Sequence, residues 1–152
     1  MFCPKRWEAE RREKAPFAEK PYVRETAPWI EKKMLRRYLS PDVMELLDEI
    51  GELSETARGS PFFKDSLIGL DYTMRKAFEF AEEGNAQGVL HEVSLFYPQF
   101  NFIISEVHNL AHEGIISGPD ADKVEEALEE MERAFHRDLS KMLEEAIKSK
   151  SR

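Results

Sequence analysis

Apolar side chains recur at helical spacing along most of this chain, and this periodicity limits the possible folds more than any other feature. Between residues 121 and 148 they alternate four and three apart, the spacing of a seam between packed helices. Residues 41–58 and 61–84 carry similar stripes. No alternating strand pattern or β-hairpin signal competes with them. The sequence therefore predicts an all-α protein: an antiparallel helical bundle of four to five helices with an extended, partly helical N-terminal arm.

The predicted core consists of the apolar residues on these helical faces. It comprises Val43, Leu46, Leu47, Ile50, Leu53, Ala57, Phe63, Leu67, Leu70, Met74, Ala77, Phe78, Ala81, Val124, Leu128, Met131, Phe135, Leu139, Met142 and Ala146.

Helix boundaries are marked by capping residues and prolines. Ser40 is suited to an N-cap and Pro41 to the first helical position. Gly59-Ser60-Pro61 is expected to end one helix and to start the next in the same way. After the turn at residues 117–120, the last helix is predicted from about Ala121 to Lys148.

Residues 86–113 form the most apolar stretch, and their apolar side chains cover more than one helical face. This helix is therefore expected to be the central element or to be buried against a partner as well. Pro98 is expected to kink or divide it, because proline lacks the backbone N–H that continues a helix. The number of helices around Pro98 stays open at this stage.

Charge is distributed unevenly along the chain. The overall net charge is −8, yet residues 1–40 carry a net +5 and residues 41–152 a net −13. The basic part also contains Pro4, Pro16, Pro21 and Pro28, which favour extended backbone over one continuous helix. We therefore expect a basic arm over residues 1–40 and an acidic helical body over residues 41–152. An arm of this kind is suited to polyanions.

The candidate binding residues are cations interleaved with tryptophan. Four of them fall within one and a half turns of a helix predicted to start at Pro28 and to end near Tyr38. Cations can neutralise phosphates while an aromatic ring packs on a sugar or base. Alternatively, the tryptophans anchor the arm on the bundle and the cations are only solvated. The candidates are Lys5, Arg6, Trp7, Arg11, Arg12, Trp29, Lys32, Lys33, Arg36 and Arg37.

The segment around Glu49 resembles the first metal helix of the MazG-like nucleotide pyrophosphohydrolases. In that family a Glu-x-x-Glu pair and a Glu-x-x-Asp pair together hold magnesium, which here implies Glu49 with Glu52 and Glu79 with Glu82. The last residue departs from the expected aspartate. Helical periodicity places Glu52 and Glu79 opposite the apolar faces of their helices, which favours a solvated face over a metal site.

His108 and His112 lie four residues apart, so their rings could share a metal with Glu106, Glu113 or His91. The alternative is a partly buried histidine pair at a helix edge. The sequence contains no phosphate-binding loop. No catalytic residue, metal ligand or cofactor is therefore assigned.

Composition indicates the environment of the protein. Cys3 is the only cysteine, which excludes an internal disulfide framework. The sequence has neither a stretch of about 18 apolar residues nor a signal-peptide pattern at its start. Three Asn and two Gln stand against 23 Glu, a bias typical of hyperthermophile proteins. We expect an intracellular protein or a virion component without a membrane span.

A basic, proline-interrupted, partly helical arm followed by a helical bundle resembles the major coat proteins of filamentous viruses of hyperthermophilic archaea. In that family the arms wrap double-stranded DNA and the bundles pack side by side into a filament. The resemblance implies a structural protein that binds nucleic acid without sequence specificity and assembles with itself or a related subunit. A magnesium-dependent pyrophosphohydrolase and a helical adaptor docking through its arm are the alternatives. DNA, RNA and protein partners for the arm stay open.

Overall fold

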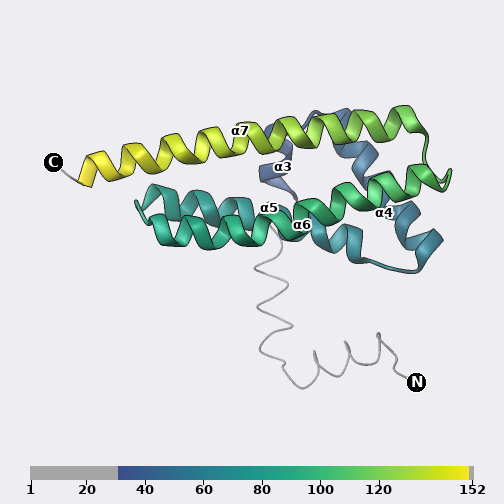
Figure 1. The fold of residues 1–152 in the computed structure, drawn as a ribbon, viewed down its shortest axis with the longest axis horizontal. Helices are drawn as coiled ribbons and strands as arrows, with labels where there is room; N and C mark the ends of the chain where they lie inside the picture. Colours follow the sequence, from purple (N-terminus) through teal and green to yellow (C-terminus); the bar gives the residue numbers. More distant parts are fainter. Residues whose placement is uncertain (1–30, 151–152) are drawn as a thin grey trace, which may run out of the picture. The chain divides into compact units, whose positions relative to one another are not determined.

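The computed structural model describes residues 31–150, which form α-helices and no strand (Figure 1). The predicted all-α bundle is confirmed. Contacts define a compact unit that begins at Lys32, so the charge boundary at residue 40 falls inside this unit. The helices are α3 (Lys33–Tyr38), α4 (Pro41–Arg58), α5 (Phe62–Glu82), α6 (Ala86–His112) and α7 (Gly118–Lys150).

Three long helices build the centre of the bundle. A short turn joins α5 to α6, and the two form an antiparallel hairpin with the most extensive helix–helix contact of the unit (Figure 1). The helix α7 packs against both of them. All predicted core positions of α5 are buried, from Phe63 to Ala81, and so are those of α7 from Val124 to Leu139. Helical periodicity therefore identified the two faces that meet in the core.

The two shorter helices cover this centre. The helix α4 packs on α5, α6 and α7, and α3 packs on α4, α5 and α7. On α4, Leu47 and Ile50 are buried as predicted, whereas Leu53 is 39% exposed and Ala57 lies on the exposed surface. The predicted stripe of α4 thus loses contact with the core toward its C-terminal end.

Capping explains where the helices begin and end. Ser40 caps α4 as predicted, its Oγ accepting the Val43 N–H at 3.2 Å, and Gly59 ends that helix with φ of 65°. The predicted start of α5 is one residue early, because the Ser60 hydroxyl accepts the Phe62 N–H and forms a local turn instead of an N-cap.

The helix α7 begins at Gly118, three residues before its predicted start. Pro119 therefore lies in the first turn, where a missing N–H costs no helical hydrogen bond. The Ser117 hydroxyl accepts the Asp120 N–H at 3.2 Å and caps this turn. A sequence that looks like a separate turn is thus the beginning of the helix.

The helix α6 runs through Pro98 without division, so of the two outcomes expected at this proline, a kink or a division, the division is wrong. Ser94, whose carbonyl loses its helical partner at the proline, is exposed, as is Pro98, so water can reach that carbonyl. Some apolar residues of α6 stay outside the core: Leu90 is 68% exposed, Leu95 42% and Phe102 39%. Only part of the wide apolar surface predicted for this helix is therefore buried within the compact unit.

Candidate nucleic-acid interface

The cationic helix α3 is held on the bundle by its apolar side. It has six residues, and a helix this short is not stable alone in water. Leu35 is fully buried and Leu39 is 5% exposed, while Met34 and Tyr38 pack partly against the same core. The core predicted from the sequence included none of these four residues. Packing on the bundle, rather than helix propensity, therefore forms α3.

A buried carboxylate from α5 caps the N-terminus of α3. Asp71 is 1% exposed, and its Oδ1 accepts the Leu35 N–H at 2.8 Å. The local N-cap residue, Lys32, has a left-handed backbone with φ of 55° and contributes no side-chain cap. Burial raises the pKa of Asp71, while the N–H groups of Leu35 and Met34 oppose this rise. Asp71 thus supplies a cap that α3 lacks in its own sequence.

The four cations predicted around α3 have different surroundings. Lys32 is 17% exposed and its Nζ lies 3.1 Å from Oδ1 of Asp48, so this lysine pairs with the body. Lys33 and Arg36 are exposed. The Arg37 guanidinium lies 5.2 Å from the ring centre of Phe78 and 5.7 Å from that of Tyr38. The other candidates lie outside the described residues: Lys5, Arg6, Trp7, Arg11, Arg12 and Trp29.

A cleft beside α3 adds cations that the sequence interpretation missed. It has a volume of about 350 Å³ and lies where α3 meets the middle of α7. Arg133 and Arg137 are four residues apart, so they form a row on one side of α7. The only sequence signal for this row was the repeat of basic residues at 133, 137 and 141. We call this site the Tyr38 cleft; it is lined by Tyr38, Glu130, Met131, Arg133, Ala134 and Arg137.

A hydrogen bond fixes the tyrosine at the edge of this cleft. The Tyr38 hydroxyl donates to Oδ2 of Asp138 at 2.6 Å, joining α3 to α7. Burial, together with the Asp138 carboxylate, raises the pKa of Tyr38 well above its usual range. Tyr38 is therefore neutral at physiological pH, with its hydroxyl committed to Asp138.

Two arginines beside the Tyr38 cleft differ from those basic side chains of residues 31–150 that pair with carboxylates. Within residues 31–150, Arg37 and Arg133 form no ion pair, and Arg137 has only a 3.8 Å approach to Asp138. In contrast, carboxylates lie within 4.0 Å of the cationic groups of Lys32, Arg58, Lys64, Arg75, Lys76 and Lys148. Positive charge is thus available where α3 packs on α7, as it is at Lys123 and Lys141, which also form no ion pair within residues 31–150.

Two of the four carboxylates considered for a MazG-like magnesium site take part in ion pairs instead. Glu52 lies 2.8 Å from Lys64, and Glu79 lies 3.1 Å from Lys76 and 3.6 Å from Arg75. Among residues 31–150 the structure forms no group of three or more metal-ligating side chains. The resemblance to that family therefore gains no support from the arrangement of these glutamates.

The histidine pair of α6 also differs from its sequence interpretation. His108 and His112 are exposed, and the His108 side chain is 75% accessible, with Glu125 at 3.9 Å. The alternative of a partly buried pair is therefore wrong. Glu106, which was considered as a further ligand, is buried, accepts a hydrogen bond from Ser54 at 2.7 Å and pairs with Arg58 at 3.1 Å. It holds α6 against α4.

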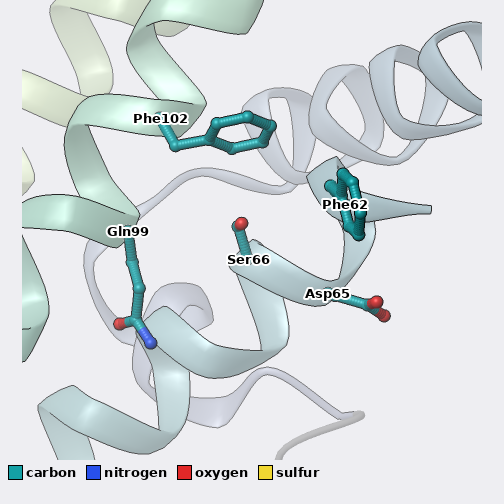
Figure 2. A pocket seen from close by; sticks show the side chains of 5 residues that line it. All are labelled: Phe62, Asp65, Ser66, Gln99 and Phe102. Carbon is teal, nitrogen blue, oxygen red and sulfur yellow. The ribbon is translucent and has the colours of Figure 1, made fainter. Parts of the chain in front are cut away.

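A second depression is apolar and lies between α5 and α6. Figure 2 shows the Phe102 ring above Ser66 and the Phe62 ring to one side of it, with Asp65 turned away from both rings and Gln99 on the side opposite Phe62. Its volume is about 300 Å³, and Phe62 is 61% exposed. We call it the Phe62 cleft, after the lining residues Phe62, Asp65, Ser66, Gln99 and Phe102.

Gln99 is held in the wall of this cleft by two features of α5. Its Oε1 accepts the Thr73 hydroxyl at 3.0 Å. A Cβ at Gly69 would lie 2.8 Å from Gln99 Nε2, so the glycine makes room for this amide.

Comparison with known proteins leaves these sites to be interpreted from their own chemistry. No protein-family profile, curated protein or solved structure matches the chain. None of the helices within residues 31–150 has the length and apolar character needed to span a membrane.

Proposed function

We propose that this chain is a structural protein that binds a nucleic-acid backbone without sequence specificity and self-assembles, in the manner of a virion coat subunit. The position of α3 carries this proposal. Leu35 and Asp71 attach the helix to the body, so its exposed cations Lys33, Arg36 and Arg37 have a defined position at the end of the basic segment. Cations on a fixed helix can contact phosphates with little loss of conformational entropy.

The negative charge of the body restricts where a polyanion can bind on this molecule. Residues 41–152 carry a net charge of −13, which opposes contact between most of the body and a polyanion. Binding is therefore confined to the basic segment and to the surface beside it. Nothing in α3 presents an element suited to reading base edges, so contacts to phosphate and sugar would dominate. Double-stranded DNA is the partner we propose, following the resemblance of the chain to filamentous coat proteins.

We expect the full-length protein to bind a labelled DNA duplex with a strong salt dependence. Replacing Arg36 and Arg37 by alanine should reduce the slope of log affinity against log salt by about 1–2, because each phosphate contact contributes about 0.9 to that slope. Fluorescence anisotropy between about 50 and 200 mM salt measures it. Thermal unfolding of the variant checks that α3 stays folded.

A matched variant tests whether the effect depends on the position of the removed cations or only on the net charge of the protein. Lys123→Ala with Lys148→Ala removes the same charge from α7, outside the Tyr38 cleft. It should leave the slope within about 0.5 of the full-length protein. No duplex binding at low salt would refute the proposal. Tighter binding of a single-stranded RNA of equal length would replace DNA as the partner.

The Phe62 cleft supports the self-assembly part of the proposal. Phe62 protrudes from the surface and also forms one wall of the cleft, so a second copy could place its own Phe62 in the cleft by a two-fold contact. Leu95 and Phe102, both about 40% exposed, extend the apolar surface on α6. Adjacent exposed aromatic and aliphatic side chains are typical of interaction surfaces.

Phe62→Ser combined with Phe102→Ser should shift the assembly toward monomer by tenfold or more in dissociation constant, because burial of an aromatic side chain is worth about 1.5–3 kcal/mol. Sedimentation analysis of the full chain over a concentration series measures this shift. Leu90→Ser is the control, since Leu90 is more exposed but does not line the cleft. A wild-type chain that is monomeric at every concentration would contradict self-assembly.

A further inference from the structure

The Tyr38 cleft joins parts of the chain that are a hundred residues apart. Tyr38 belongs to α3 and Asp138 to α7, and the hydrogen bond between them is 2.6 Å long. Asp138 also faces Arg137, whose Nε lies 3.8 Å from Oδ1. This carboxylate therefore positions both a neutral phenol and a guanidinium at the edge of the same cleft.

The charges around the cleft favour an anionic ligand. Arg133 and Arg137 line it, and Arg37 lies beside the Tyr38 ring. Two carboxylates oppose them: Glu130, which lines the cleft, and Asp138, which is engaged with Tyr38. Arg133 forms no ion pair within residues 31–150, although α7 is rich in glutamate.

The shape of the cleft suits a phosphodiester more than a large ligand. Its volume of about 350 Å³ is at the small end for ligand sites, and it opens to solvent beside α3. Residues four apart on a helix have Cβ atoms about 5–6 Å apart, so Arg133 and Arg137 can reach the oxygens of the same group. A guanidinium presents paired N–H donors that match phosphate oxygens. The Tyr38 ring provides a surface for the neighbouring sugar.

We propose that the Tyr38 cleft is a phosphate-binding site through which a nucleic-acid backbone bound at α3 continues onto α7. This inference rests on the proposed nucleic-acid function and extends it to a helix that lies in the acidic part of the chain. Arg133 and Arg137 bind the phosphodiester, Arg37 contributes positive potential from α3, and Glu130 weakens the site by repulsion.

Two single substitutions in the full-length chain test the site in opposite directions. Arg133→Ala should weaken binding of the labelled duplex about three- to tenfold at 50 mM salt and lower the salt slope by about 1. Glu130→Gln should strengthen binding about two- to fivefold at the same salt, because it removes a negative charge beside the phosphate. Both effects should diminish at high salt.

Each substitution has a control on the same helix. Lys123→Ala removes a positive charge, and Glu129→Gln removes a negative charge one residue from Glu130; both positions are exposed and neither lines the cleft. If Arg133→Ala and Glu130→Gln change binding no more than these controls while the wild-type chain binds, the cleft inference is overturned and the proposed function stands. If the wild-type chain binds no duplex, both fail.

Discussion

Replacing Phe135 by alanine is expected to lower the free energy of unfolding by about 3–5 kcal/mol. Phe135 is fully buried on α7. Its ring stacks on that of Phe96 from α6 at 5.2 Å and meets that of Phe78 from α5 edge-on at 5.3 Å. One side chain therefore joins the three central helices, and its removal leaves a cavity that rigid neighbouring helices cannot fill. Urea denaturation followed by circular dichroism measures the loss.

Leu90→Ala is the control for Phe135→Ala. Leu90 is 68% exposed on α6, so its truncation should cost less than about 0.5 kcal/mol. Phe135→Leu should lie between the two, because leucine fills part of the space without restoring the ring contacts. Equal losses for Phe135→Ala and Leu90→Ala would contradict the central position of this ring.

The second large effect is expected for Asp71→Ala, which should destabilise the protein by about 2–3 kcal/mol. The substitution leaves the Leu35 N–H without its acceptor in a buried position. Because α3 has no local side-chain cap, we expect its attachment to the bundle to weaken first. Urea denaturation measures the global loss, and faster hydrogen exchange at the Leu35 amide detects the opening of α3.

Asp71→Asn is the matched variant, since the amide oxygen can still accept the Leu35 N–H. It should lose less stability than Asp71→Ala at neutral pH. An equal loss for the two variants would contradict the contribution of this hydrogen bond. No faster exchange at Leu35 in Asp71→Ala would refute the capping role.

The difference in stability between wild type and Asp71→Asn should depend on pH, because the pKa of Asp71 is raised in the folded protein. A raised pKa means that the folded state binds the proton more tightly than the unfolded state. This contribution to stability is complete below the ordinary aspartate pKa of about 3.9 and is lost as pH rises through the folded value. Asparagine does not titrate, so the stability of wild type minus that of Asp71→Asn should decrease from about pH 4 to pH 7. An increase would contradict the burial effect.

The helices themselves could be predicted because their signals are local. The stripe from Phe63 to Ala81 is a repeat along one helix, and a repeat of this kind specifies a face that must be buried whatever its partner. Ser40 caps α4 through a contact three residues away, which the sequence also contains. The start of α7 was harder to predict, because Gly118 and Pro119 suit both a turn and a first helical turn.

Local sequence patterns of this kind predicted only part of the candidate site. The cations of α3 were evident as a cluster, but the pairing of Lys32 with Asp48 depends on α4 lying beside it. The role of Asp71 depends on α5 meeting the start of α3. Arg133 and Arg137 look like isolated cations in an acidic helix until Tyr38 is placed against them.

The sequence by itself determined the all-α class, the buried faces of the long helices and the contrast between a basic N-terminal segment and an acidic remainder. These properties are encoded within a few residues of each other or in composition. Only the tertiary structure decided that α3 belongs to the compact unit, that Asp71 caps it and that α7 adds arginines beside Tyr38. The reason is physical: these contacts join residues 36 to 100 positions apart, and they form only when separate helical faces pack.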